Sequence, residues 1–419
     1  MLMALHANGH GVSSSNAVLV VHCDGPVDTG RLSKSIERFL QFCPWPAARL
    51  RRPFPWGKLH WAANGRASVP PPVRRRTVAT PAELQEAIDT EVNTAIDPTR
   101  DPPLRFLIVD GAPEAMSAGG VLVMTWFHPL MDPRGAQNLL HHLVHLDRHP
   151  GDAPWGGVVP AFVRADDSRP FRERGRLARK SLEYMRTLPR VRPVSPPASH
   201  AGRVRFRQVA FVEREPAAKS RLTREIWWRL AVVGKAMRRL WERRSVPDIP
   251  FLLPVAIDLR PKGDVGPTFG NMLAFHFARF KPSDAADVPR LASMLREQIA
   301  DAMREGQIEA NEIAMDFLQY RPLPFVRRAL RRTGGETFSF NCADVMDFPA
   351  ALERCFGARV VNAYHIPAVP PRPGIGVFFN RCAGRSNLVV AWLEGVVTDD
   401  DVTRIVETVR EGMEWVEAS

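Results

Sequence analysis

The chain has 419 residues and a formal net charge of +12, with 45% hydrophobic and 24% charged residues. This composition excludes an intrinsically disordered or fibrous protein, and the length allows roughly two to three domains of ~150 residues. The five cysteines stand far apart in the sequence. Their spacing excludes a CxxC metal site, argues against a disulfide framework and favours a reducing cytoplasm.

No stretch of the sequence reaches the ~18 apolar residues of a transmembrane helix. Residues 1–16 lack the basic and apolar regions of a signal peptide. We therefore expect a cytoplasmic protein, and the sequence leaves peripheral contact with a membrane open.

The first 160 residues alternate between strand-like and helix-like segments. Residues 17–23 form a short β-branched run that ends at a turn, and Asp28 can cap the helix that follows. Thr80 and Glu83 have the spacing of a capping box at the start of a second amphipathic helix. Strand-like runs at 104–109 and 121–127 precede a helix at 136–146. This alternation predicts an α/β layer.

Most of the net charge lies in one segment. Residues 164–208 carry thirteen Lys or Arg and four acidic residues, a net +9 of the total +12, together with five prolines. We interpret residues 161–208 as a basic, partly helical crossover between two lobes. Its charge is typical of a solvated linker, although docking of an anionic partner or a membrane surface would also explain it. Nucleic acid is not expected as a partner, because the sequence has no zinc-finger spacing, RNP-like strand or helix-turn-helix pattern.

Residues 209–419 repeat the α/β character. Helical periodicity covers 220–244 and 288–305 and returns in a last helix after Thr398, while strand-like runs lie at 251–259, 272–280, 338–340, 377–380 and 388–393. The histidines at 141–149 have no carboxylate at zinc spacing, so we predict no metal site.

The most informative segment is 121–135. A hydrophobic strand ends at His128, Asp132 follows four residues later, and a Pro-Arg-Gly turn leads into a helix. A histidine at a strand end can take a proton from a substrate while its other ring nitrogen is held by a hydrogen bond. Pairs of the type His-x-x-x-Asp are common by chance, so this spacing alone favours a structural role.

Several motifs together resemble the chloramphenicol acetyltransferase-like superfamily, which includes peptide-synthetase condensation domains, HxxxD plant acyltransferases and bacterial wax ester synthase/diacylglycerol acyltransferases. The family signature HHxxxDG is matched at His128 and Asp132, with Phe127 in place of the first histidine and Pro133 in place of the glycine. Residues 20–50, 96–105, 257–261 and 269–271 are similar to further family motifs, in the same order.

The resemblance implies two chloramphenicol acetyltransferase-like α/β lobes, at 1–160 and 209–419, each a mixed sheet flanked by helices. The lobes would meet in a V with a central tunnel. The resemblance also implies a bacterial acyltransferase of lipid or secondary metabolism. Such an enzyme moves an acyl group from acyl-CoA or an acyl-carrier protein to a hydroxyl or amine acceptor, with the thioester as co-substrate and no bound cofactor.

The same resemblance assigns roles to individual residues. His128 would be the general base, Asp132 and Arg260 would form an ion pair that ties the lobes together, and Asn271 would orient substrate or stabilise the oxyanion. Further substrate contacts are expected from Phe127, Gly135, Ser339 and Asn341. The phosphates of the donor are expected to meet Arg172, Arg174, Arg176 and Arg179.

Two departures from the signature leave an alternative open. Several branches of the superfamily lack the first histidine, but Pro133 and Pro129 could change the turn that aims His128, because proline cannot adopt the dihedral angles of glycine. The alternative is a catalytically inactive homologue that keeps the tunnel as a lipid or carrier-protein binding module.

Overall fold

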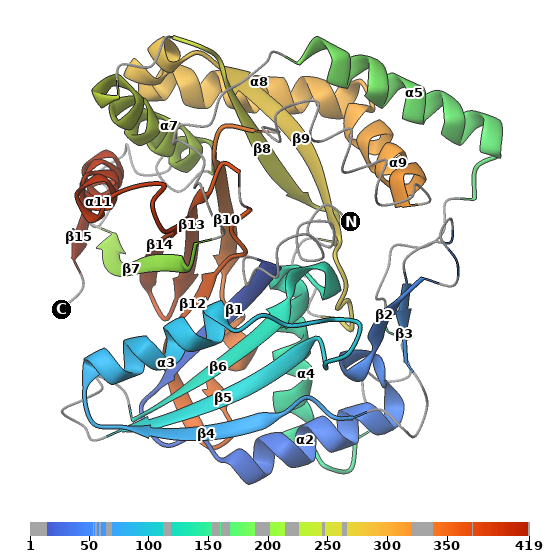
Figure 1. Cartoon of the computed structure of the whole chain (residues 1–419), viewed down its shortest axis with the longest axis vertical. Helices are drawn as coiled ribbons and strands as arrows, with labels where there is room; N and C mark the ends of the chain where they lie inside the picture. The colour runs from blue at the N-terminus through green and yellow to red at the C-terminus, as the bar shows by residue number, and fades with distance from the viewer. Residues whose placement is uncertain are drawn as a thin grey trace.

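The computed structural model describes residues 15–52, 54, 57, 60–63, 69–111, 119–152, 160, 168–188, 202–213, 226–244, 248–261, 266–319, 338–370 and 372–417. Two lobes lie one above the other in Figure 1, and each is built around its own β-sheet. No helix within these ranges is both long enough and apolar enough to cross a membrane. The α/β architecture with mixed sheets agrees with the sequence-based prediction.

The lower lobe contains a six-stranded sheet in the order β11-β12-β1-β6-β5-β4. Its strands are β1 (Asn16–Cys23), β4 (Val73–Val78), β5 (Leu104–Gly111), β6 (Gly120–Phe127), β11 (Arg354–Cys355) and β12 (Ala358–Ile366). A short pair, β2 (Arg49–Arg51) and β3 (His60–Ala62), lies beside it. The helices of this lobe are α2 (Thr29–Phe42), α3 (Pro81–Asn93) and α4 (Pro133–Arg148).

The alternation of side chains along β1 separates two layers of core. Val18 and Val20 pack in the cluster that contains the apolar residues of α3, whereas Leu19 and Val21 pack with those of α2 and α4. Since successive side chains of a strand point to opposite faces, α3 covers one face of the sheet and α2 with α4 covers the other. Each of these helices begins at a side-chain cap, as the sequence indicates for the first two; the caps are Asp28, Thr80 and Asp132.

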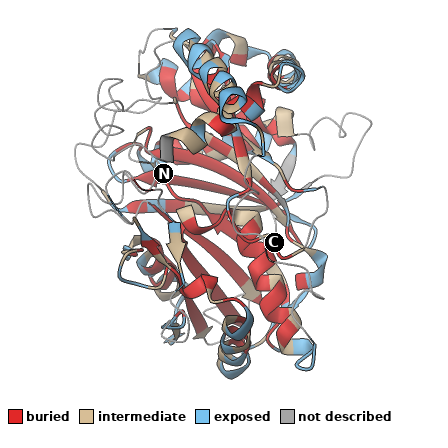
Figure 2. Cartoon of the chain, turned by 90° about the vertical axis from the view of Figure 1, so that its right-hand side faces the viewer, coloured by how far each residue is buried: buried red, intermediate tan, exposed pale blue. Residues whose placement is uncertain are grey.

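The upper lobe contains a five-stranded sheet in the order β10-β13-β14-β7-β15 and a separate two-stranded hairpin. The sheet strands are β7 (Val204–Glu213), β10 (Asn341–Asp347), β13 (Ile375–Cys382), β14 (Arg385–Leu393) and β15 (Trp415–Glu417), and the hairpin consists of β8 (Phe251–Asp258) and β9 (Leu273–Phe280). The helices are α7 (Ile226–Arg243), α8 (Val288–Arg304), α9 (Gln307–Gln319) and α11 (Asp399–Met413). Buried residues concentrate in the strands and in the helix faces turned toward them (Figure 2).

The sheets do not follow the predicted boundaries at 160 and 209. Strands β11 and β12, from the range assigned to the C-terminal lobe, complete the lower sheet, where β12 pairs with β1 along its length. Strand β7 begins at Val204, inside the range assigned to the crossover. The addition of β12 to the lower sheet has a physical reason. Without β12, the apolar strand β1 would be an exposed edge that could pair with other chains.

The predicted crossover is partly helical, as expected. Helix α5 (Phe171–Thr187) lies along α9 at the outer side of the upper lobe (Figure 1). The Tyr184 hydroxyl donates to the Phe277 carbonyl at 2.8 Å, and the Ser181 hydroxyl donates to Asn311 Oδ1 at 2.8 Å. Residues 161–167 and 189–201 of the crossover lie outside the described part of the chain.

Candidate active site

The connection from β6 to α4 carries the predicted site. All eight residues of β6 are buried, and the strand passes directly into a 3₁₀ turn at His128–Leu130. Asp132 then caps α4, and Pro133 occupies the first turn of that helix. A proline in this position is favourable, because its backbone nitrogen needs no partner there and its fixed φ suits a helix. Pro133, which stands where the family signature has glycine, is therefore compatible with the backbone conformation of the turn.

Asp132 and Arg260 form the predicted ion pair. Arg260 Nη1 donates to Asp132 Oδ2 at 3.0 Å, and both side chains are almost completely buried. The carboxylate also accepts from the backbone nitrogens of Gly135 and Met272, each at 2.8 Å. Because Arg260 and Met272 belong to the end of the β8–β9 hairpin, this one carboxylate ties the upper lobe to the His128 connection.

Asn271 supports the His128 turn, as the structural part of its expected role requires. Its side-chain nitrogen donates to the carbonyl oxygens of His128 at 3.2 Å and of Pro129 at 2.9 Å. On the other side, Trp126 Nε1 donates to the Met131 carbonyl at 2.9 Å. Asn271 thus braces the backbone of the His128 turn through its side-chain N–H groups, while a contact of this exposed residue with substrate or an oxyanion stays a prediction.

The electrostatics of His128 suit a base. Burial lowers its pKa below the ordinary value of 6.5, while the Asp132 carboxylate and a hydrogen bond with the residue's own backbone carbonyl act in the opposite direction. The residue as a whole is half-buried, so part of it reaches the surface. A neutral imidazole that donates from one nitrogen keeps a lone pair on the other. His128 can therefore accept a proton at neutral pH.

Comparisons with known proteins agree with this geometry at the level of fold. No family model matches the chain, and no curated protein matches it. The condensation domain from Monacolin K polyketide synthase MokA superposes with a TM-score of 0.67 at 16% identity, covering 98% of this chain and 94% of that chain. The first condensation domain of the calcium-dependent antibiotic synthetase, in complex with substrate analogue 3a, gives 0.66 at 16% identity, covering 99% and 93%.

The chain has the two-lobed condensation-domain fold. A mutant of the starter condensation domain of rhizomide synthetase RzmA, solved in complex with C8-CoA and Leu-SNAC, is also similar, with a TM-score of 0.66 at 12% identity over 99% of this chain and 92% of that chain. The fold that the motif resemblance implies is thus present over nearly the whole chain.

Within this condensation-domain fold, Gly135 is a packing residue rather than a substrate contact. A Cβ atom built on it would lie 2.1 Å from the Phe269 carbonyl oxygen, so the start of α4 lies directly against the backbone that leads to Asn271. Only glycine permits this approach.

We expect Gly135→Ala to destabilise the fold by about 2 kcal/mol, because the methyl group must push the 269–271 backbone away from α4. Gly175→Ala is the matched control: Gly175 lies in α5, where an added Cβ would meet no described atom within 4 Å outside its own helix, and alanine there should stabilise the helix by about 0.5–1 kcal/mol. Urea denaturation of both variants measures the two effects. Equal stability of the two variants would contradict the packing role.

The other predicted substrate contacts lie in the interior. Phe127 is 1% exposed and packs with Leu50 and Ile96, which makes it part of the core. The Ser339 hydroxyl is fully buried and accepts from the Leu252 nitrogen at 3.0 Å, so it holds the hairpin to the segment before β10. Asn341 begins β10 and is half-buried. Phe127 and Ser339 thus have structural roles, and the substrate contacts expected of them stay predictions.

The predicted donor-binding arginines lie along α5. Arg174 is half-buried, 3.8 Å from Asp316 and stacked over the Phe317 ring, so it is occupied within the fold. Arg172, Arg176 and Arg179 are exposed, and Arg179 pairs with Glu183 on the same helix at 2.9 Å. Binding of donor phosphates by these three side chains stays a prediction.

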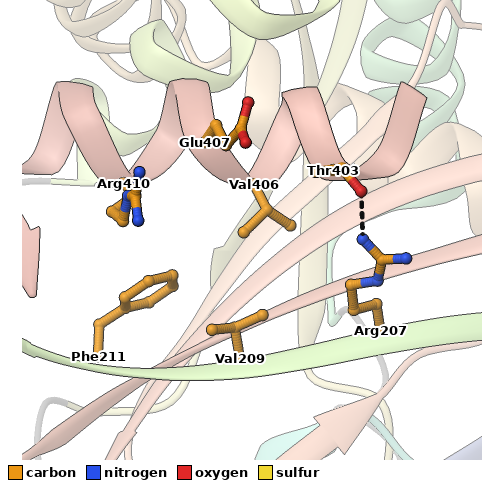
Figure 3. A pocket seen from close by; sticks show the side chains of 7 residues that line it. All are labelled: Arg207, Val209, Phe211, Thr403, Val406, Glu407 and Arg410. Atoms are coloured by element: carbon orange, nitrogen blue, oxygen red, sulfur yellow. Dashed lines mark hydrogen bonds between the residues drawn. The ribbon is translucent and has the colours of Figure 1, made fainter. Parts of the chain in front are cut away.

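A hollow of about 230 Å³ lies between β7 and α11 (Figure 3). Arg207 and Phe211 reach it from the strand, and Glu407 and Arg410 from the helix. The residues that line it lie on β7 and α11 and none belongs to the His128 connection, so this hollow is separate from the candidate active site.

His365 was missed by the sequence analysis. It lies on β12 opposite Leu19 of β1, is 2% exposed, and interacts electrostatically with His128. Burial lowers its pKa to about 3, with the nearby His128 as a second cause. Only the pairing of β12 with β1 brings this residue beneath the His128 connection, and no local pattern in the sequence signals that pairing.

Buried neutral histidines predict a loss of stability in acid. The pKa of His276, on β9, is lowered to about 4, mainly by burial, and that of His365 to about 3. Both titrate near 6.5 when unfolded, so their contribution to stability is complete above pH 6.5 and is lost as the pH falls toward 4 and 3, by about 1.4 kcal/mol per pH unit for each group. Urea denaturation at pH 7, 6 and 5 should show this decline, and His276→Leu should make it shallower. Equal stability at pH 7 and pH 5 would contradict it.

Proposed function

We propose that this protein is an acyltransferase that moves an acyl group from a thioester to a hydroxyl or amine acceptor, with His128 as the general base. The observation that carries the proposal is the His128 turn. A half-buried histidine with a lowered pKa stands where the two lobes meet, and its backbone is braced from both of them by Asn271 and Trp126.

The proposed reaction needs only a base and correct positioning. The acceptor oxygen or nitrogen attacks the thioester carbonyl carbon while the free nitrogen of His128 takes the acceptor proton. The tetrahedral intermediate then collapses, the carbon–sulfur bond breaks, and the proton on His128 passes to the leaving thiolate. The products are the ester or amide and the free thiol, without a covalent acyl-enzyme. Holding both reactants at His128 supplies much of the rate.

The nature of the donor is proposed by analogy. One similar structure, the RzmA variant, holds C8-CoA and Leu-SNAC, and another holds a substrate analogue. We therefore propose acyl-CoA or a phosphopantetheinyl acyl-carrier protein as donor here.

The test is product formation. The protein is incubated with a panel of acyl-CoAs, and with the same acyl groups on a phosphopantetheinyl carrier, in the presence of alcohol or amine acceptors. Thiol release is followed together with mass spectrometry of the products. The proposal expects an acylated acceptor with at least one donor. Tight binding of the thioesters without product from any acceptor would instead favour the inactive binding module.

A further inference from the structure

His365 and Gln137 form a pair of polar side chains behind the His128 connection. Gln137 Nε2 lies 3.1 Å from His365 Nε2, and the His365 ring meets the edge of Trp126 with centroids 6.0 Å apart. Trp126 belongs to the end of β6 and Gln137 to the second turn of α4. His365 therefore touches both elements that hold the His128 turn between them.

Each member of the pair has one polar atom without a partner. Among the described residues, neither His365 Nδ1 nor Gln137 Oε1 has a hydrogen-bond partner, although the two side chains are 2% and 0% exposed. An unpaired polar atom in the interior is costly, and native proteins keep few of them, each with a reason such as strain, a catalytic role or a bound water, ion or ligand. Two of them on adjacent side chains, beside the candidate base, point to a ligand group that completes them.

The chemistry of the pair defines that group. If Gln137 Nε2 donates to His365 Nε2, the imidazole carries its proton on Nδ1 and offers a donor, while Gln137 Oε1 offers an acceptor. If the Gln137 amide is instead rotated by 180°, its oxygen accepts from His365 Nε2. Its nitrogen is then the free donor and His365 Nδ1 the free acceptor. Neither side chain carries a charge, so an ionic ligand would be buried without a counter-charge. The pair suits a neutral amide or hydroxyl group.

We propose that His365 and Gln137 form a polar subsite beside His128 that hydrogen-bonds a neutral amide or hydroxyl group of a substrate. This inference rests on the proposed function and names a part of its substrate recognition. Two sources offer the required chemistry: the pantetheine arm of the donor thioester, which carries amides, and the acceptor.

The first test is stability, which needs no activity. In the double variant Gln137→Met/His365→Leu both unpaired atoms are removed and the shapes are roughly kept. If the polar pair exists for a ligand, the unliganded double variant should melt at the same temperature as the wild type or higher, because removing both members of a poorly satisfied polar pair is neutral or favourable. A purely structural pair predicts a lower melting temperature.

The second test is substrate recognition, with octanoyl-CoA as donor and the leucine thioester of N-acetylcysteamine as acceptor. In the double variant we expect KM for one of the two to rise about tenfold, as for the loss of a hydrogen-bonded contact, and the affected compound identifies the source. His276→Leu is the matched control, because His276 is a buried histidine on β9 whose Nδ1 also has no hydrogen-bond partner within the described part of the chain. It should leave both KM values unchanged.

Calorimetric titration of the same two compounds gives the readout if the wild type shows no turnover, so that a failed reaction and a failed subsite are told apart. Weaker binding in the double variant, with unchanged or higher melting temperature, supports the subsite. Wild-type affinity for both compounds together with a lower melting temperature would overturn it.

Discussion

Replacing Arg260 by methionine is expected to destabilise the protein by about 3–5 kcal/mol. The substitution removes the only side-chain cation whose contact with Asp132 is seen in the described residues, and it leaves that carboxylate 0% exposed with only backbone N–H partners. A buried charge without its counter-charge costs far more than the loss of a surface pair, because water cannot reach it. The Arg260 contact with the Gly270 carbonyl, at 2.8 Å, is lost as well.

The matched control is Arg359→Met. Arg359 pairs with Asp24 at the same 3.0 Å, but the side chains are 64% and 42% exposed, so its loss should cost far less than the loss of Arg260. Urea denaturation of both variants gives the comparison. A second variant, Arg260→Met/Asp132→Leu, removes both buried charges and should recover part of the lost stability. If Arg260→Met costs no more than Arg359→Met, the pair does not tie the lobes in the way proposed here.

The central pair could be predicted because the family resemblance assigns it, and short motifs carry that resemblance. His128 and Asp132 lie four residues apart at a strand end, and Arg260 stands in a second recognisable segment. The spacing alone does not bring Arg260 to Asp132, and only the resemblance implies their contact. The effect of Pro133 was harder to predict, because a proline that disturbs a loop is favourable at the first turn of a helix. The difference depends on a helix boundary, which sequence patterns locate poorly.

Two of the strands that the sequence analysis missed contain arginines, whose charge obscures the strand pattern. Strand β7 alternates arginines with apolar residues, and its charge drew the segment into the predicted crossover. Strand β4 contains three consecutive arginines, which find carboxylate partners on α3 and β5. Strand β12 crosses back to the lower sheet, a non-local pairing that no window of residues encodes. For this reason, only the structure shows that His365 lies close to His128.

The largest expected effect on activity belongs to His128. His128→Ala should lower kcat by about 10²–10⁴-fold, the range for loss of a general base, while KM for the donor changes little because the braced backbone of the turn does not depend on the imidazole. His145→Ala, on the partly exposed side of α4, is the control and should retain wild-type rates. Thiol release measures both.

The pH dependence of kcat/KM gives the role of His128 a second test. A general base works only when it is neutral, and burial places the pKa of His128 below 6.5. Activity should therefore stay level from pH 8 down to pH 6.5 and fall at lower pH as the imidazole takes up a proton, whereas the residual activity of His128→Ala should lack this fall. The profile must be read at pH values where urea denaturation finds the protein folded, because the buried histidines also weaken the fold in acid. Equal rates and equal profiles for the two proteins would remove His128 from the chemistry and leave the fold as a thioester-binding module.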